Sequence, residues 1–286
     1  MPILGAFILP HPPIILPGIG KGEEKRIQKT TDSFREVARR VKELAPETIV
    51  LTSPHSVMYA DYIHISPGER ASGDMRQFRA PEIIARAAYD TEFVRELEML
   101  ALTNGIPAGT QGERSAALDH GTMLPLLFIN EQYTDYKLVR TGLSGLPMAD
   151  HYRFGMCIRD AAEKTGRRVV LIASGDLSHK VRAEGPYGYA DEGVQFDREI
   201  TQAMASGDFL KFLSFTPEFA EKAAECGLRS CVILAGAFDG IDVGPELLSY
   251  EGTFGVGYGV ASFIPKGENQ DRRFLEKYFA LEEARM

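Results

Sequence analysis

Residues 3–13 read Ile-Leu-Gly-Ala-Phe-Ile-Leu-Pro-His-Pro-Pro, an apolar run that stops at a proline and a histidine. Residues 47–56, Glu-Thr-Ile-Val-Leu-Thr-Ser-Pro-His-Ser, repeat this pattern. Between the two runs, residues 23–44 are rich in helix formers, and their apolar side chains recur close to every 3.6 residues. A buried strand, a helix and a second buried strand form a βαβ unit, so the two runs predict parallel strands of one sheet.

The same alternation continues downstream. Residues 137–140 predict a strand, residues 149–164 a helix, and residues 168–173 a strand that ends in Ser-Gly-Asp. Two late runs, 246–250 and 257–264, predict further strands that would join the sheet at an antiparallel edge. The expected fold class is therefore α/β, a single domain with a mostly parallel central sheet flanked by helices on both faces. Further helices are expected at residues 90–103, 122–130, 192–205, 217–224 and 228–237, and residues 61–66 predict a strand with one solvated face.

Composition sets the class of protein. The chain has 286 residues, 44% of them hydrophobic, and a formal net charge of −8, which argues against nucleic acid or an anionic membrane surface as a partner. No run approaches the ~20 apolar residues that a membrane-spanning helix needs. Three cysteines without a CxxC spacing indicate a reducing, cytoplasmic setting. Residues 1–265 are expected to form the domain, and residues 266–286 a charged linker followed by a helix over 274–286.

Four of the six histidines follow apolar runs or lie in glycine-containing turns: His11, His55, His120 and His179. In open α/β sheets, ligands bind outside the carboxyl ends of the strands, and three predicted strands end near these histidines. Neutral imidazole is the commonest metal ligand and also titrates closest to neutral pH. The cluster therefore predicts a metal site, acid–base catalysis, or both.

A third metal ligand is expected from residues 223–227, Ala-Ala-Glu-Cys-Gly. Two histidines and one carboxylate form the facial triad of non-haem Fe(II) oxygenases, which favours Glu225. Cys226 would make a softer site. The structural alternatives are that Glu225 caps a helix beginning near residue 228 and that Cys226 is a small buried apolar residue.

Five motifs in this order resemble the LigB-like family, which comprises the class III extradiol ring-cleavage dioxygenase B subunits and their Memo-like relatives. The resemblance extends to about Pro265. The motifs are Leu-Pro-His-Pro-Pro-Ile at 9–14, Ser-Pro-His-Ser at 53–56, Leu-Asp-His-Gly at 118–121, Ser-Gly-Asp-Leu-Ser-His at 174–179 and Glu-Cys-Gly-Leu-Arg-Ser at 225–230.

This resemblance implies a non-haem Fe(II)-dependent extradiol dioxygenase that cleaves a catechol-like ring with O₂. By the match of motifs, His11, His55 and Glu225 would hold Fe(II), with zinc as the alternative metal. His179 would act as base toward the substrate, and His120 would stabilise the oxygen-derived intermediate. Asp176 and Asp119 would set turns or imidazole tautomers.

The Memo-like relatives carry a cysteine at the position of Cys226, so the resemblance leaves Glu225 and Cys226 open as the third ligand. It also implies a second function, a Memo-like metal-binding protein with a redox or interaction role and no ring cleavage. The expected partners are a small aromatic substrate and O₂. A homo-oligomer, and an AMMECR-type domain or protein partner as in the AmmeMemoRadiSam grouping, stay open.

Overall fold

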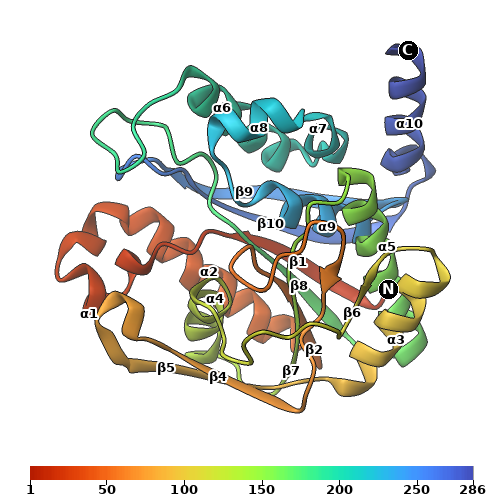
Figure 1. Ribbon diagram of the computed structural model, residues 1–286, viewed down its shortest axis with the longest axis horizontal. Coiled ribbons are helices and arrows are strands. Elements are labelled where there is room, and N and C mark those ends of the chain that lie inside the picture. Colours follow the sequence, from red (N-terminus) through yellow and green to blue (C-terminus); the bar gives the residue numbers. More distant parts are fainter. Residues whose placement is uncertain (286) are drawn as a thin grey trace.

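The computed structural model describes residues 1–285 and contains a central six-stranded sheet (Figure 1). Four neighbouring strands, β7, β2, β8 and β1, are parallel, and the last two, β10 and β9, continue the sheet as an antiparallel edge. The predicted α/β class, the mostly parallel sheet and the antiparallel edge are confirmed. In sheet order the strands are β7 (Lys137–Thr141), β2 (Thr48–Thr52), β8 (Val169–Ser174), β1 (Ile3–Leu9), β10 (Tyr258–Glu268) and β9 (Ile241–Glu251).

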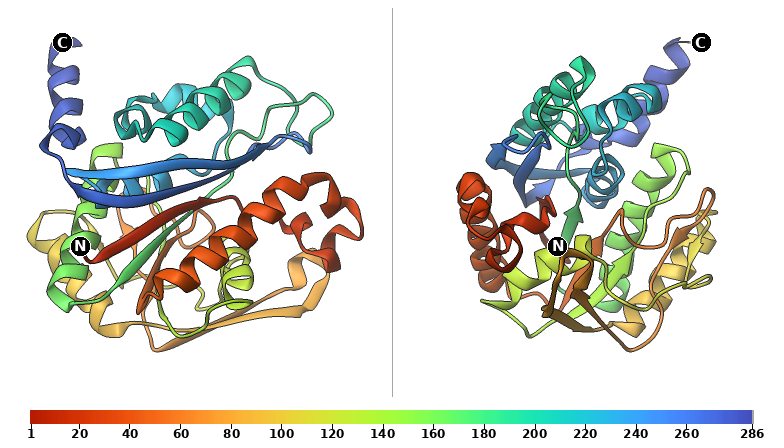
Figure 2. Two further views of the ribbon diagram at one scale, coloured as in Figure 1. Left: turned by 180° about the vertical axis from the view of Figure 1, so that it is seen from behind. Right: turned by 60° about the vertical axis from the view of Figure 1, so that its left-hand side comes forward.

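Helices cover both faces of the sheet (Figure 2). One face packs against α2 (Gln28–Leu44) and α4 (His120–Asn130). The other face packs against five helices, which are α3 (Thr91–Thr103), α5 (Met148–Thr165), α6 (Asp191–Ser206), α7 (Phe209–Ser214) and α9 (Leu228–Ala237). The remaining elements are α1 (Pro17–Gly20), α8 (Pro217–Ala223), α10 (Phe274–Arg285), β3 (Ile63–His64), β4 (Arg70–Met75), β5 (Ala80–Ala88), β6 (Ala108–Gly109) and 3₁₀ turns at Pro13–Ile15, Glu23–Ile27, Arg76–Phe78 and Gln270–Arg272.

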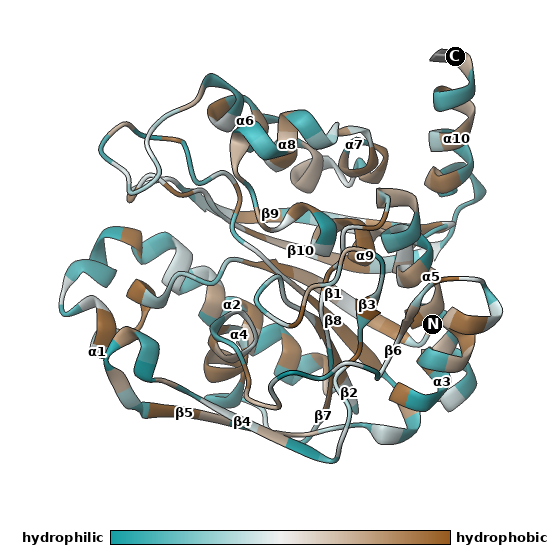
Figure 3. Ribbon diagram, viewed as in Figure 1, coloured by the Kyte–Doolittle hydropathy of each residue, from teal (hydrophilic) through white to brown (hydrophobic). Residues whose placement is uncertain are grey.

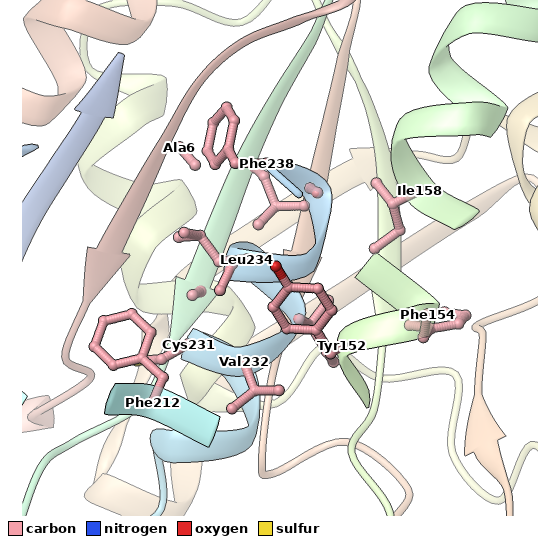
Figure 4. Packing of buried hydrophobic residues seen from close by; sticks show 14 of the residues in the cluster. Ala6, Tyr152, Phe154, Ile158, Phe212, Cys231, Val232, Leu234 and Phe238 are labelled. Atoms are coloured by element: carbon pink, nitrogen blue, oxygen red, sulfur yellow. The ribbon is translucent and has the colours of Figure 1, made fainter. Parts of the chain in front are cut away.

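The core divides into two layers because successive side chains of a strand point to opposite faces. In β8, Leu171 belongs to the layer beneath α5 and α9, whereas Val170 and Ile172 belong to the layer beneath α2 and α4. All six residues of β8 are buried, as a strand covered on both faces requires. Figure 3 shows the central strands as predominantly hydrophobic, and Figure 4 shows side chains of α9 between those of α5 and α7.

Some local expectations differ from the structure. Residues 63–66 are all buried, so the predicted solvated face is wrong, because β3 pairs with β6 and lies beneath the loop after β6. The hairpin of β4 and β5 lacks a strong sequence signal, since its strands are largely exposed. The predicted terminal helix is present as α10, with Met286 outside the described residues. Within residues 1–285 no helix is long and apolar enough to cross a bilayer.

Candidate metal centre

The strand ends bring the predicted histidines together. Leu9 of β1 pairs with Ser174 of β8, and Thr52 of β2 pairs with Ala173, so three neighbouring strands end at the same level. The segments that leave them carry His11, His55 and His179. Because α4 begins at His120 over the same edge, the ring centroids of His120 and His55 lie 4.0 Å apart. The sheet thus assembles the predicted cluster at its carboxyl edge.

His11 is buried and held in one tautomer. Its Nδ1 lies 3.0 Å from the Ser174 hydroxyl oxygen, and that hydroxyl donates its only hydrogen to the Gly121 carbonyl at 2.7 Å. Ser174 must therefore accept a hydrogen bond from Nδ1–H of His11, which leaves a lone pair on Nε2. Burial and the neighbouring His55 lower the pKa of His11 to about 3, so the ring is neutral. A neutral ring with a free Nε2 is the form that binds a metal.

The His55 ring contacts the His11 ring through their Nε2 atoms. The two Nε2 atoms are 3.0 Å apart, while the His55 side chain remains exposed to solvent on its other side. Its approach to α4 depends on Gly121, because a Cβ there would lie 2.6 Å from the Ser53 hydroxyl oxygen and 3.3 Å from the His55 ring. Burial lowers the pKa of His55 as well. Because Nε2 of His11 carries a lone pair, Nε2–H of His55 donates the hydrogen bond between the two rings, and the His55 hydrogen must move to Nδ1 before both rings can present lone pairs to one metal ion.

Cys226 supplies the third donor. Its Sγ lies 3.7 Å from Nε2 of His11 and accepts a hydrogen bond of 3.2 Å from the Asp176 backbone N–H. The segment that carries Cys226 can come this close to the segment that carries Asp176 because the two meet at glycines. A Cβ on Gly175 would lie 2.1 Å from the Gly227 Cα. The ligand atoms of His11, His55 and Cys226 all lie within 4.8 Å of one another.

Glu225, the carboxylate expected to be the third ligand, is engaged elsewhere. Its Oε2 accepts a hydrogen bond of 2.6 Å from the Leu228 backbone N–H at the start of α9. Desolvation raises the pKa of Glu225 to about 6, against hydrogen bonds from the backbone of Leu228 and Gly227 and the charge of Arg229. The side chain therefore stabilises a helix N-terminus, which is the structural alternative raised by the sequence.

His179 faces the cluster as a hydrogen-bond acceptor. Its Nδ1–H donates to the Ala224 carbonyl, so its lone pair lies on Nε2, which is 3.9 Å from an oxygen of Asp176. Ala224 has a left-handed backbone, with φ of 53°, which is uncommon outside glycine. The segment that carries Cys226 therefore also fixes the tautomer of His179.

His120 is oriented as a donor. Its Nδ1 accepts a hydrogen bond of 3.3 Å from the Gln77 amide, which leaves Nε2 to carry the hydrogen. Burial and the rings of His55 and His11 lower the pKa of His120 to about 3, so it is neutral. Asp119 caps the same helix, accepting from the Thr122 N–H at 2.9 Å. Although burial acts against its ionisation, hydrogen bonds from Ser53 and Thr122 keep the pKa of Asp119 low.

Asp176 is buried beside His11. Its Oδ1 accepts a hydrogen bond of 2.8 Å from the His11 backbone N–H, and burial raises its pKa. It therefore fixes the turn that carries His11. The two remaining histidines lie elsewhere: His64 contacts the Gln111 carbonyl and Glu113, as expected for a structural residue, and His151 contacts Ser144 and Pro147.

A cavity of about 890 Å³ opens onto His11, His55, His120 and His179. Most of its wall comes from loops whose sequence carries no signal for a site. Tyr258 belongs to the glycine-rich run 252–259, whose spacing indicates only a hairpin, and that hairpin joins β9 to β10. Besides the histidines, the aromatic and charged residues of the wall are Arg26, Phe78, Asp176, Arg182, Glu184, Tyr187, Phe254 and Tyr258.

Asp197 lies beneath the loop that carries His179. It accepts hydrogen bonds of 2.7 Å from the Ser178 N–H and from the Tyr250 hydroxyl. Burial, reinforced by the Asp176 carboxyl, raises the pKa of Asp197 to about 7, against those two hydrogen bonds. A carboxyl whose pKa is higher in the folded chain stabilises the fold below about pH 4, and this contribution is lost as the pH rises through 7.

We therefore expect Asp197→Asn to become more stable relative to the wild type as the pH rises. Between pH 5 and pH 8 the difference in unfolding free energy should grow by roughly 2 to 3 kcal/mol in favour of the variant, because asparagine has no charge to bury. Urea unfolding of both proteins at several pH values measures this. Differences that stay constant with pH would show that Asp197 does not titrate in this range.

This chain matches one family model, and its fold is similar to that of a solved structure. A family model described as the catalytic LigB subunit of aromatic ring-opening dioxygenase matches residues 5–261. The crystal structure of the uncharacterized protein JW3007 from Escherichia coli K12 superimposes with a TM-score of 0.55 at 16% sequence identity, covering 91% of this chain and 99% of that chain. At this identity the likeness supports the fold alone.

Three curated proteins are similar in sequence. Protein CA_C1420 of Clostridium acetobutylicum is 40% identical over 267 residues, which cover 91% of this chain and 57% of that protein, so the chain spans little more than half of it. The 3,4-dihydroxyphenylacetate 2,3-dioxygenase of Escherichia coli is 28% identical, covering 73% of this chain and 80% of that enzyme. The 2-aminophenol 1,6-dioxygenase beta subunit of a Pseudomonas species is 25% identical, with coverages of 91% and 93%.

Proposed function

Because the chain belongs to the LigB family, the catalytic subunits of aromatic ring-opening dioxygenases, we propose that it is a non-haem Fe(II)-dependent extradiol dioxygenase. Membership in this family agrees with the resemblance carried by the five sequence motifs. The proposal adds the reaction itself, in which O₂ cleaves a catechol-like ring beside its two oxygens. Both oxygen atoms enter the product, so one O₂ is consumed for each ring opened.

One observation carries the proposal. Two neutral imidazoles with Nε2 atoms 3.0 Å apart and a thiol sulfur 3.7 Å from one of them face a cavity with aromatic walls. Two further histidines line the same cavity as an acceptor and a donor. Three possible ligand atoms of these types within 4.8 Å of one another are typical of a metal site.

The residues present fit a transition metal. Imidazole suits iron, copper, nickel and zinc, and a thiolate adds affinity for softer ions. We therefore propose His11, His55 and Cys226 as the ligands, in place of the set with Glu225, whose carboxylate hydrogen-bonds to the start of α9. When bound, Fe(II) would supply the redox chemistry that allows O₂ to react with an aromatic ring; zinc would bind the same donors without this chemistry.

The remaining side chains would transfer a proton, donate a hydrogen bond, or hold the imidazole rings in position. His179 presents Nε2 with its lone pair and would accept the proton of a ring hydroxyl. His120 presents Nε2–H and would donate a hydrogen bond to a developing negative charge on oxygen. Asp176 holds the His11 turn and Asp119 holds the start of α4 with His120, so each carboxylate keeps an imidazole in place.

The cavity supports an aromatic substrate larger than a bare catechol. About 890 Å³ is in the range of sites for drug-sized ligands, and Phe78, Tyr187 and Phe254 give it apolar walls. Arg182 lines the same cavity, and its guanidinium has no hydrogen bond or ion pair within residues 1–285. It would pair with an acidic substituent, as on the 3,4-dihydroxyphenylacetate named for the Escherichia coli relative.

Oxygen consumption tests the proposal. Anaerobically purified protein reconstituted with Fe(II) is expected to take up O₂ with at least one of catechol, 4-methylcatechol, 3,4-dihydroxyphenylacetate or 2-aminophenol. Uptake should be one mole per mole of ring and should yield a yellow ring-opened product. A zinc-loaded sample of the same protein is the control and should take up none. A stable iron centre that consumes no O₂ with any of these compounds would contradict the proposal.

The donor set also favours a second candidate function. A thiol in place of a carboxylate is the feature that the Memo-like relatives share, and it supports a metal-binding protein with a redox or interaction role and no ring cleavage. An AMMECR-type domain or a second copy of the chain would then be the expected partner. The same oxygen measurement separates the two functions, because the Memo-like role predicts a bound metal without O₂ uptake.

A further inference from the structure

Tyr258 is a buried polar side chain that faces the cavity and has no partner. It is the first residue of β10, only 4% exposed, and it lines the cavity together with His179 and Asp176. Within residues 1–285 its hydroxyl makes no hydrogen bond, and the hydroxyl oxygen is not fully buried, so it is accessible from the cavity that the side chain lines. The ring is therefore held by the protein, while the hydroxyl is left free to hydrogen-bond to a molecule in the cavity.

A second tyrosine on the same hairpin provides the comparison. Tyr250, on β9, donates its hydroxyl hydrogen to Asp197 at 2.7 Å and therefore has a structural partner. Tyr258 lies across the hairpin, paired in register with Glu251. Both tyrosines therefore lie on the paired strands β9 and β10. The hydroxyl of Tyr250 is hydrogen-bonded within the protein, and the hydroxyl of Tyr258 is not.

The unpaired hydroxyl complements a histidine that lines the same cavity. His179 offers an acceptor to the cavity, since its hydrogen is on Nδ1 and bonded to the Ala224 carbonyl. Tyr258 offers a donor to the same cavity. A ring with two adjacent oxygens presents what this pair requires, because one oxygen releases a proton while the other accepts a hydrogen bond.

We propose that the Tyr258 hydroxyl donates a hydrogen bond to an oxygen of the aromatic substrate and is a specificity-determining residue for ortho-dioxygenated rings. This inference rests on the proposed function. Tyr258 acts by recognition, since burial and the nearby Asp176 and Tyr187 raise its pKa and keep the phenol protonated. Losing one hydrogen bond to an ionised substrate oxygen costs roughly ten- to hundredfold in affinity.

Binding of 4-nitrocatechol to the zinc-loaded full chain tests the proposal, because the absorption of this compound reports its ionisation and zinc prevents turnover. Tyr258→Phe is expected to bind it about ten- to hundredfold more weakly than the wild type. Tyr250→Phe is the matched control and should bind normally. Urea unfolding should show the opposite pattern, with a lower midpoint for Tyr250→Phe and an unchanged or higher midpoint for Tyr258→Phe.

Three other results of these binding and unfolding measurements would each contradict a different part of the proposal. Equal affinity of Tyr258→Phe and the wild type for 4-nitrocatechol would overturn the role of Tyr258 and leave the proposed function intact. A loss of stability in Tyr258→Phe as large as in Tyr250→Phe would show that the hydroxyl has a structural partner, which also overturns the inference. Failure of the zinc-loaded wild type to bind 4-nitrocatechol would instead contradict the proposed function, and the inference with it.

Discussion

Replacing Cys226 with alanine should abolish tight metal binding. In the structure its sulfur completes a group of three donors with His11 and His55, all within 4.8 Å of one another. Removing even a residue that only supports a metal ligand typically costs 10- to 100-fold in affinity, so the loss of a direct ligand should exceed about 100-fold. Metal content after purification and titration with Co²⁺ measure the effect, and a sulfur-to-cobalt charge-transfer band should be present in the wild type and absent from Cys226→Ala.

Glu225→Gln is the matched control, one residue away. Because the Glu225 carboxylate accepts a hydrogen bond from the Leu228 N–H, the variant should keep its metal. It should lose about 1 kcal/mol of stability, since a neutral amide at the start of α9 interacts less favourably with the helix dipole. The opposite result, in which Glu225→Gln loses the metal and Cys226→Ala retains it, would restore the carboxylate as the third ligand.

The comparison of Glu225 with Cys226 shows where sequence reasoning reached its limit. The strands and the parallel sheet follow from the apolar runs, and the convergence of His11, His55 and His179 follows from the position of the strand ends, because burial on both faces of a sheet is encoded locally. The direction of two adjacent side chains is not encoded in this way. It depends on the close contact of Gly175 with Gly227, which are 52 positions apart in the sequence.

The cavity walls were unpredictable for a related reason. Arg182, Tyr187 and Phe254 lie on loops without periodic patterning, and a loop residue becomes part of a site only through the packing of distant segments. A Cβ on Gly185 would lie 2.8 Å from the Gly255 Cα, so the two loops meet at their glycines. Tyr258 had a signal, the glycine-rich run around it, but that pattern indicates a hairpin and says nothing about an unpaired hydroxyl.

Replacing His179 with glutamine should reduce turnover while leaving the metal bound. His179 lies outside the group of three donors, and its Nδ1–H is bonded to the Ala224 carbonyl, so only its Nε2 lone pair is available for chemistry. Glutamine can occupy similar space and form hydrogen bonds but cannot take up a proton near neutral pH. Loss of a general base costs about 10²- to 10⁴-fold in rate.

Steady-state O₂ uptake with the best substrate, together with the iron content of each sample, measures this effect. Added imidazole should restore part of the rate to a His179→Ala variant, because a free base can enter the space that the side chain leaves; it should not restore Cys226→Ala, whose defect is the metal itself. A His179→Gln enzyme that turns over at the wild-type rate would remove His179 as the base. His120 would not be a ready replacement, because its Nδ1 accepts from Gln77 and its Nε2 carries the hydrogen, so that it enters the cavity as a donor.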